Sequence, residues 1–256
     1  MAENGDQFWP DFRGRTYLVS GCSSGIGLEV SRLLLENGAS LIGITRDVDR
    51  TGEIFDGLPK KSEAIYIGLD LSRADENVVL DLGQDRKVHG FVHAAGIASS
   101  MPVRHTKDKN MVAQMRLNTF SLIWIFNRLR RDSRLIRGDF SLVGVSSVLS
   151  SRGVAGAAGY SASKGALESA IRVLAAEFAD RSWRFNSVRA GTVSTPMTER
   201  LFEQVGEDAT EQIAEHHPLG IGTPRDIASS VLFLLSPRAK WITGTSLVVD
   251  GGYSVV

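Results

Sequence analysis

The sequence is poor in cysteine, carries no excess of either charge and contains no long apolar run. Cys22 is the single cysteine in 256 residues, so the chain can form neither an internal disulfide nor a cysteine-rich zinc cluster. The 29 basic residues balance the 29 acidic ones, and a net charge of zero gives no long-range attraction to nucleic acid. The longest apolar runs, such as residues 122–126 and 231–235, fall far short of the roughly 20 residues that span a bilayer.

Length and composition instead fit one folded domain. A hydrophobic content of 43% with 23% charged residues is typical of a globular chain. At this length such a chain buries roughly 70–75% of its unfolded surface. No linker, low-complexity stretch or repeat divides the chain, so we expect one domain over residues 1–256. Residues 1–6 are acidic and polar where a secretory signal would be basic and then apolar, so we expect a cytoplasmic protein.

Short β-rich apolar runs recur along the chain, with room for a helix between them. These runs are residues 16–19, 41–44, 64–67, 90–93, 140–145, 185–189 and 246–249. They are continuous rather than alternating, which indicates strands buried on both faces of a parallel sheet. Apolar residues at helical spacing follow in residues 26–34 and 163–178. The alternation predicts a doubly wound α/β fold with right-handed crossovers.

The first predicted strand runs into a glycine-rich turn that opens a helix. Glycines permit a tight turn and let the backbone approach a pyrophosphate, to which the helix N-terminus offers unpaired N–H groups. The spacing, Gly21, Gly25 and Gly27, is not that of a P-loop, because no Gly-Lys-Ser/Thr follows. We expect a dinucleotide here, and a turn without a ligand is the alternative. The expected contacts are Ser20, Gly21, Ser23, Ser24, Gly25, Ile26 and Gly27.

Cys22 lies within this turn. A helix N-terminus lowers thiol pKa values, which would make such a cysteine reactive. We favour the simpler interpretation, in which Cys22 is a small loop residue without a chemical role.

Tyr160 and Lys164 stand four residues apart at the head of a long predicted helix. Positions i and i+4 share one face, so the phenol and the ammonium project to the same side. An ammonium near a phenol stabilises phenolate and lowers its pKa from about 10 toward neutrality. Tyr160 could then exchange a proton with a carbonyl and alcohol pair. Taken alone, however, this pair is common on helix surfaces.

Two further polar residues complete a pattern. Ser147 follows the predicted strand 140–145 and precedes Tyr160 by 13 residues, and Asn118 lies on the preceding helix. With the glycine turn, these residues resemble the short-chain dehydrogenase/reductase family over residues 15–253. The resemblance implies a Rossmann fold with a seven-stranded, mostly parallel sheet in the order 3-2-1-4-5-6-7.

The same resemblance implies hydride transfer between a nicotinamide ring and a carbonyl carbon. Tyr160 would exchange the proton, and Ser147 would hydrogen-bond the same oxygen. Lys164 would lower the pKa of the phenol and bind the nicotinamide ribose, while Asn118 would hold a water that relays protons. No metal is needed, and the sequence has no clustered ligand set to hold one.

Further cofactor contacts follow from the resemblance. Residues 70–71 match the pair at the adenine, residues 93–96 match an Asn-Asn-Ala-Gly motif, and residues 190–195 match the segment that holds the carboxamide. Two departures, Ala94 for an asparagine that braces the central strand and Ala190 for a proline, put local rigidity in doubt. The expected contacts are Asp70, Leu71, Ala94, Ala95, Gly96, Tyr160, Lys164, Gly191, Val193 and Thr195.

The end of the second predicted strand bears on which nicotinamide cofactor binds. NAD enzymes place an acidic residue there for the ribose 2′-hydroxyl, and NADP enzymes place a basic one for the 2′-phosphate. Here Thr45 is neutral, and Arg46 offers a bidentate donor. The pair favours NADP(H). NAD(H) stays open if Arg46 is instead a solvated residue paired with Asp47.

Residues 195–219 lie where the family places a substrate lid, and we expect a mobile, partly helical cover there. Within it, we expect His216 and His217 to be exposed residues without a role, and contacts to the substrate are the alternative. Five arginines between residues 128 and 137 predict a solvated face or an interface rim. Docking of an acidic carrier is the sharper alternative.

These observations predict an NADP(H)-dependent oxidoreductase that interconverts a carbonyl and a secondary alcohol. Its substrate would be a small molecule or a carrier-bound group, as in the 3-oxoacyl-carrier-protein reductases that the chain resembles. The resemblance also implies a homotetramer or homodimer, and we expect neither nucleic acid nor membrane as a partner. The alternatives are an NAD-dependent alcohol dehydrogenase of the same family and a non-catalytic nucleotide-sensing scaffold.

Overall fold

The computed structural model of the protein describes residues 12–56, 63–83 and 86–256, and the acidic residues 1–6 lie outside them. In the described part, seven strands form one parallel sheet in the order β3-β2-β1-β4-β5-β6-β7. The predicted fold class and strand order are therefore confirmed. The strands are β1 (Thr16–Ser20), β2 (Ser40–Thr45), β3 (Ala64–Gly68), β4 (Gly90–His93), β5 (Ser141–Ser147), β6 (Arg184–Ala190) and β7 (Ser246–Val249).

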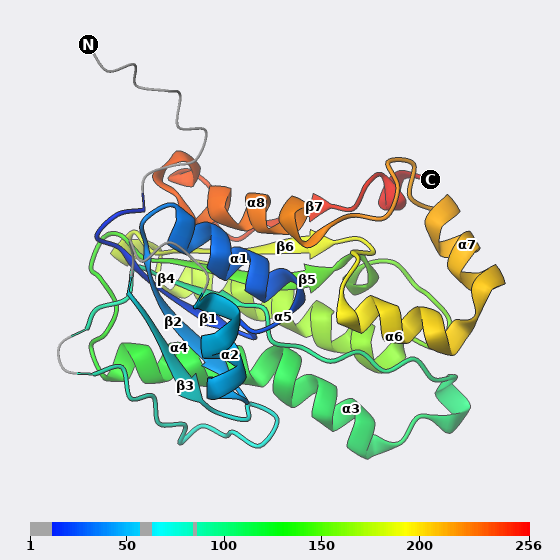
Figure 1. Ribbon diagram of the computed structural model, residues 1–256, viewed down its shortest axis with the longest axis horizontal. Helices are drawn as coiled ribbons and strands as arrows, with labels where there is room; N and C mark the ends of the chain where they lie inside the picture. Colours follow the sequence, from blue (N-terminus) through cyan, green and yellow to red (C-terminus); the bar gives the residue numbers. More distant parts are fainter. Residues whose placement is uncertain (1–11, 57–62, 84–85) are drawn as a thin grey trace, which may run out of the picture.

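Helices connect the strands and cover both faces of the sheet (Figure 1). A π-helical segment, Arg116–Phe120, joins α3 to α4. The α-helices are α1 (Gly25–Glu36), α2 (Val48–Phe55), α3 (Asp108–Met115), α4 (Ser121–Arg131), α5 (Ala158–Glu177), α6 (Pro196–Val205), α7 (Glu207–Glu215) and α8 (Pro224–Leu235).

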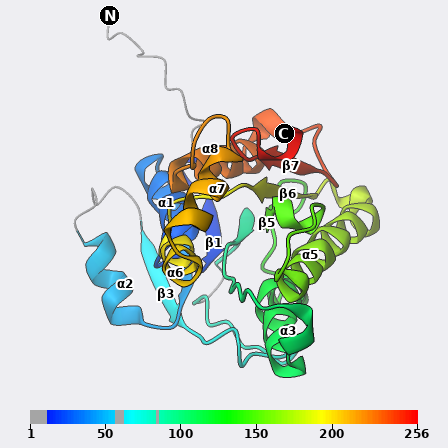
Figure 2. The ribbon, with the colours of Figure 1, turned by 90° about the vertical axis from the view of Figure 1, so that its right-hand side faces the viewer.

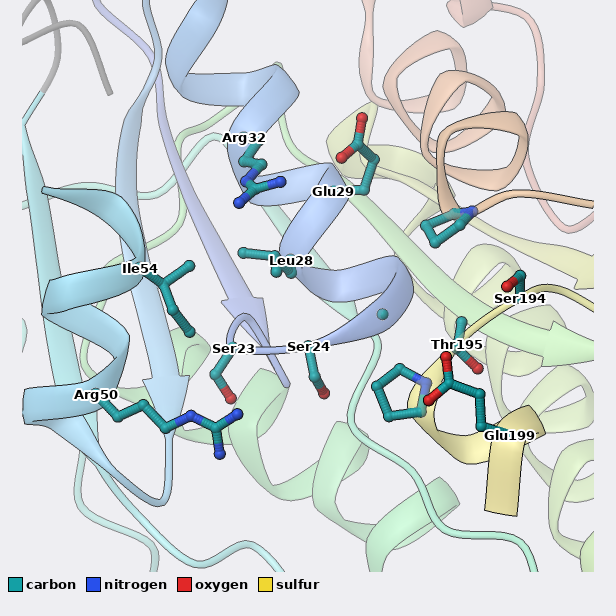
Figure 3. A pocket seen from close by; sticks show the side chains of 13 residues that line it. Ser23, Ser24, Leu28, Glu29, Arg32, Arg50, Ile54, Ser194, Thr195 and Glu199 are labelled. Carbon is teal, nitrogen blue, oxygen red and sulfur yellow. The ribbon is translucent and has the colours of Figure 1, made fainter. Parts of the chain in front are cut away.

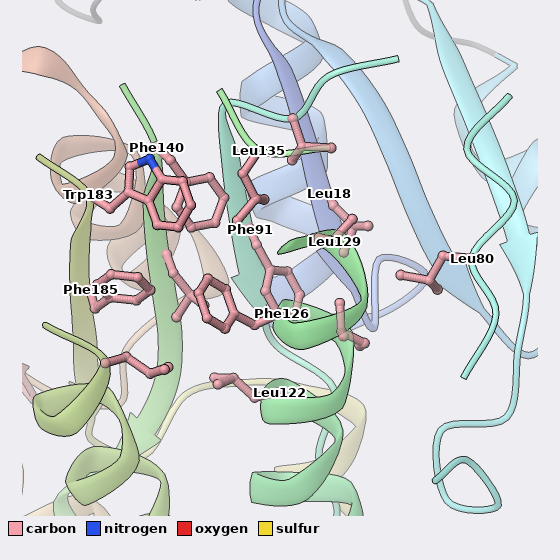
Figure 4. Close-up of a cluster of buried hydrophobic side chains, with 14 of the residues drawn as sticks. Leu18, Leu80, Phe91, Leu122, Phe126, Leu129, Leu135, Phe140, Trp183 and Phe185 are labelled. Atoms are coloured by element: carbon pink, nitrogen blue, oxygen red, sulfur yellow. The ribbon is translucent and has the colours of Figure 1, made fainter. Parts of the chain in front are cut away.

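Two apolar layers sandwich the sheet because successive side chains of a strand point to opposite faces. In β1, Leu18 packs with α4 and α5, whereas Tyr17 and Val19 pack with α1 and α8. Figure 4 shows the first layer, which is rich in aromatic rings. The ring of Phe126 lies 5.4 Å from that of Phe185, nearly perpendicular to it, as paired aromatics prefer. Burial on both faces explains why the strands read as continuous apolar runs.

The ends of α1 and α8 follow from local sequence. Asn37 ends α1 by donating its side-chain amide to the carbonyl of Leu33 over 2.7 Å, and Gly38 then adopts a positive φ of 86°. At the start of α8, Thr223 and Asp226 form a capping box, with Pro224 in the first turn. These local signals set the C-terminal end of α1 and the N-terminal end of α8.

The parallel strands place their carboxyl ends along one edge of the sheet, toward the right in Figure 1. The glycine turn after β1, the end of β4, the end of β5 and the N-terminal turns of α5 meet there, and α6 and α7 stand beyond them (Figure 2). Ligands bind at this edge in open α/β sheets. Among the described residues, every helix is too short or too polar to pass through a bilayer.

Candidate active site

The glycine turn packs so tightly that side chains are excluded from it. Gly21 has a φ of +72°, and a Cβ there would lie 2.8 Å from the backbone nitrogen of Ala95. A Cβ on Gly27 would lie 2.2 Å from the carbonyl oxygen of Gly21. Within the described residues, the Ser24 hydroxyl does not cap α1, whose first turn also holds no acidic residue. Free N–H groups in a glycine cradle suit a pyrophosphate, so these residues fit a dinucleotide.

A cavity of about 340 Å³ opens beside this turn, between α1, α2 and the segment that leads into α6 (Figure 3). Its lining includes three residues that the sequence predicts to contact the cofactor, namely Ser23, Ser24 and Thr195. Arg50 extends into it from α2 toward Ser23. No motif in the sequence pointed to Arg50. Its position four residues after Arg46 on a short helix was the available signal.

The Thr45 side chain faces inward rather than toward this cavity. It is 5% exposed, and its hydroxyl accepts the backbone N–H of Asp47 over 3.2 Å and contacts the Thr51 hydroxyl at 2.9 Å. The Asp47 carboxylate caps α2 by accepting the backbone N–H of Arg50. Arg46 is exposed, and its charge contributes to holding down the pKa of Asp70, after the hydrogen bond from Ser72. Of the predicted pair, the arginine is therefore the residue that presents a free functional group.

Cys22 is fully buried, and burial raises the pKa of its thiol to about 12. Its sulfur approaches the carbonyl oxygen of Ile44 at 3.6 Å. A thiol held neutral in this way is a poor nucleophile, which removes the reactive alternative and leaves a packing role.

Buried His93 connects the glycine turn to the π-helical segment. Its Nε2 lies 3.1 Å from the carbonyl oxygen of Leu117, which can only accept, so Nε2 carries the proton. Its Nδ1 then accepts from the Ser20 hydroxyl at 2.8 Å, and Ser20 accepts the backbone N–H of Ala95. Burial lowers the pKa of His93 to about 3, so the ring is neutral. These hydrogen bonds link the end of β4 to the glycine turn and to the π-helical segment, next to Ala94.

Tyr160 and Lys164 lie one turn apart on α5, with the Lys164 ammonium 5.7 Å from the centroid of the phenol ring. Lys164 is 5% exposed and donates to the carbonyl oxygen of Val145 over 2.7 Å. Burial lowers the pKa of Lys164 to about 8, while the charge of Glu168 opposes that shift. Burial therefore makes this amine less basic than an ordinary lysine side chain.

The pKa of Tyr160 differs from the expectation. Burial raises it above the ordinary value, and the hydrogen bond with Ser147 offsets only part of the rise. The expected lowering by Lys164 is thus wrong for this arrangement. The physical reason is that loss of hydration opposes the phenolate more than its neighbours favour it. Ser147, at the end of β5, nevertheless stands beside the phenol as the sequence predicted.

Asn118 lies in the π-helical segment and is fully buried. Its Oδ1 accepts the backbone N–H of Ile97 over 2.8 Å, and its Nδ2 donates to the Ile97 carbonyl and to the Ser163 hydroxyl. The amide therefore clamps the loop after β4 to α5, a role that the sequence did not predict. Gly96 completes the contact, because a Cβ there would lie 3.2 Å from Asn118 Oδ1 and 3.5 Å from the Lys164 amine.

The remaining predicted contacts occupy different environments. Asp70 is half-buried and accepts from the Ser72 backbone and hydroxyl, whereas the Leu71 side chain packs into the core. Val193 is also buried in the core. Gly191 has no room for a side chain, because a Cβ would lie 2.7 Å from the Cα of Asp250. Among the described residues, no group of three side chains that could ligate a metal is found.

The predicted lid consists of α6 and α7, and Thr195 caps α6 by accepting the backbone N–H of Thr198. The prediction of two exposed histidines is half wrong. His216 is exposed, but His217 is 4% exposed, accepts the backbone N–H of Thr192 and donates to the Ile213 carbonyl. His217 therefore ties the end of α7 to the segment after β6. Its ring also lies 4.8 Å from that of Tyr253.

Sequence and structure comparisons agree with this arrangement. A family model described as enoyl-(acyl carrier protein) reductase matches residues 21–254. A galactitol 2-dehydrogenase (L-tagatose-forming) of Cereibacter sphaeroides is 33% identical, over 94% of this chain and 96% of its own. A 3-oxoacyl-(acyl-carrier-protein) reductase of Thermotoga maritima is 30% identical, over 93% of this chain and 97% of its own.

Among solved structures, a provisionally assigned NAD(P)-dependent gluconate 5-dehydrogenase of Beutenbergia cavernae, with NADP bound at low occupancy, superimposes with a TM-score of 0.85. It is 27% identical, and the match covers 96% of this chain and all of that one. The chain belongs to the short-chain dehydrogenase/reductase family. It is accordingly an NAD(P)-dependent oxidoreductase by family.

Proposed function

We propose that this protein is an NADP(H)-dependent oxidoreductase that interconverts a carbonyl and a secondary alcohol, with Tyr160 as the general acid and base. The observation that carries the proposal is the meeting of Tyr160, Lys164 and Ser147 at the carboxyl edge of the sheet, beside the glycine turn. When bound, the nicotinamide supplies or takes up the hydride.

The residues of this chain bind the substrate oxygen, transfer the proton and hold the site in position. Ser147 and Tyr160 hydrogen-bond the substrate oxygen, and Tyr160 moves the proton at its hydroxyl. Lys164 lies beside the phenol and, with its pKa lowered to about 8 by burial, passes protons near neutral pH. Asn118 holds Ile97, in the loop after β4, against Ser163 of α5, and the water-relay role stays a prediction. We assign the other predicted residues to the cofactor-binding surface, except for the buried side chains of Thr45, Leu71 and Val193.

The choice of NADP(H) rests on charge at the corner between β2 and α2. Arg50, in the first turn of α2, extends into the cavity toward Ser23, Arg46 is exposed after the end of β2, and the Thr45 side chain introduces no negative charge. A phosphate is held well by two guanidinium groups. Structurally similar proteins with bound NADP support the same choice.

The substrate side points to a class rather than a compound. Relatives named as a galactitol dehydrogenase and as a 3-oxoacyl-carrier-protein reductase support a small-molecule or carrier-bound carbonyl. We place α6 and α7 as the lid over this substrate, within a single domain. A cytoplasmic homotetramer or homodimer completes the proposal.

A spectrophotometric screen of NADPH oxidation tests it, using hexuloses, simple ketones and carrier-bound 3-oxoacyl groups. We expect turnover with at least one class. Tyr160→Phe should lower kcat by about 10²–10⁴-fold, the usual contribution of a general acid, with NADPH binding retained. Turnover that survives this substitution refutes the mechanism. NADPH binding without turnover on any class, in either direction, favours the nucleotide-sensing alternative.

A further inference from the structure

Glu168 lies on the same side of α5 as Tyr160 and Lys164, one turn beyond the lysine. Its side chain is 3% exposed, whereas most polar residues of α5 are exposed or half-buried. A carboxylate that deeply buried needs a charged partner and hydrogen bonds, and Glu168 has both. Nothing in the proposed proton transfer uses it directly, so its burial calls for another explanation.

Four donor contacts surround the Glu168 carboxylate. From β6, Arg189 binds it in bidentate fashion, with Nη2 2.6 Å from Oε2 and Nε 3.1 Å from Oε1. The hydroxyls of Ser146 and Ser150 each donate to Oε1 over 2.7 Å. Bidentate guanidinium pairs have a fixed planar geometry, so Arg189 sets the orientation of the carboxylate.

The two serines flank Ser147, which makes this arrangement relevant to the chemistry. The chain leaves β5 at Ser147 and turns at once into a short 3-10 helix, Val148–Ser150. The Ser147 hydroxyl itself is held by the backbone N–H of Leu149 over 3.2 Å. The placement of the turn therefore decides where the Ser147 oxygen lies, and Glu168 binds the turn on both sides.

We propose that Glu168, oriented by Arg189, is a positioning residue that fixes the turn carrying Ser147 against α5 and supplies the negative charge behind Lys164. The inference rests on the proposed function of this site. Misplacement of a reacting group by about 1 Å can cost about 10²-fold in rate. A carboxylate that holds the hydroxyl-bearing turn to the helix bearing the phenol prevents that displacement.

The charge of Glu168 acts on Lys164 among a small set of groups. Tyr160 and Glu168 on α5 and His93 on β4 face the ammonium, and His93 is neutral. Glu168 in turn faces Arg189, Ser146 and Ser150. Its negative charge favours the charged form of Lys164. Loss of that charge should let Lys164 deprotonate at lower pH.

The first test is Glu168→Gln, which keeps the volume and removes the charge. We expect kcat to fall about 10- to 100-fold, from displacement of the turn, with the KM for NADPH changed less than about twofold. The basic limb of the pH profile of kcat should move to lower pH. In the cofactor-free protein, amide hydrogen exchange of residues 148–152 should accelerate. The matched control is Asp132→Asn, which breaks a 2.7 Å pair with Arg128 far from the site and should change none of these.

A second pair of variants covers the case in which Glu168→Gln does not fold. Ser146→Ala with Ser150→Ala removes both hydroxyl contacts and keeps the ion pair, and should accelerate the same exchange and lower kcat. Arg189→Lys should retain most of the pH profile, because the charge survives, while kcat falls. Wild-type kcat, pH profile and exchange in the folded variants overturn the proposal.

The outcome separates this inference from the proposed function. Faster exchange at residues 148–152 with an inactive wild-type enzyme supports the positioning role and refutes the function. Loss of turnover in Tyr160→Phe with unchanged exchange in Glu168→Gln supports the function and refutes the positioning role.

Discussion

The face of α5 at Tyr160 and the corner between β2 and α2 hold their polar groups in opposite ways. On α5, Lys164 and Glu168 are buried and bound to backbone carbonyls, hydroxyls and a guanidinium. At the corner, Arg46 and Arg50 are exposed, and the Thr45 hydroxyl is hydrogen-bonded within the local turn. The first region has its geometry built in before any ligand arrives, whereas the second offers charge on flexible side chains.

The difference teaches where each property of the enzyme can be altered. Buried, partnered groups resist substitution, because a change leaves desolvated atoms without partners. Exposed arginines contribute little to stability, so they can be exchanged at small cost to the fold. Rate should therefore depend on the α5 face, and cofactor choice on the corner.

After Tyr160→Phe, the largest expected effect is at Ser147, at the end of β5 beside the phenol of α5. Ser147→Ala removes a donor to the developing oxyanion, and the loss of one such donor lowers kcat by about 10²–10³-fold. Steady-state kinetics on the best ketone from the screen measures it, with Ser151→Ala in the same turn as the control. A kcat within twofold of wild type would remove Ser147 from the mechanism.

Substitutions at the corner should change the selectivity between NADPH and NADH rather than the rate of the reaction. Arg46→Ala and Arg50→Ala should each lower the NADPH-to-NADH ratio of kcat/KM about tenfold, since a charge-assisted contact to phosphate is lost. Thermal unfolding should show nearly unchanged Tm values. Arg130→Ala, on the exposed end of α4, provides the control for loss of a surface arginine. An unchanged ratio in both corner variants would show that neither arginine recognises the 2′-phosphate.

Between the two regions stands His93, whose effect should appear in stability. Its pKa is about 3 in the folded protein and about 6.5 in an unfolded chain. The unfolded state thus binds more protons between these values, and stability falls as pH drops through that window. The slope contributed is at most about 1.4 kcal/mol per pH unit. Denaturant unfolding of wild type and His93→Asn at pH 7 and pH 5 measures it. Equal pH dependence in the two proteins would contradict the buried neutral ring.

The smallest effect is expected at Cys22. Because its thiol is buried with a pKa of about 12, alkylating reagents should leave the native protein active and unmodified. Mass spectrometry after treatment with and without denaturant measures this. Rapid modification of the folded protein would show that the glycine turn opens.

The parts of the fold set by short segments were predictable from sequence. Each β-rich run became a strand, and Tyr160, Lys164 and Ser147 were found through their spacing and their place after a strand or on a helix. The ion pair of Glu168 with Arg189 was not predictable, because it depends on how α5 crosses β6. The burial of His217 was not predictable for the same reason. Its partner Thr192 lies 25 residues away in the sequence and contacts it only when α7 folds back.

The π-helical segment at Arg116–Phe120 has a consequence for insertions and deletions. Because π-helical hydrogen bonds join residue i to residue i+5, this turn takes up one residue more than an α-helical turn. Removing one residue here would let the helix continue as α and would move Asn118 away from Ile97 and Ser163. Both the length of this stretch and the asparagine at position 118 are therefore constrained. Relatives with a working site should keep this number of residues and an asparagine at the position of Asn118.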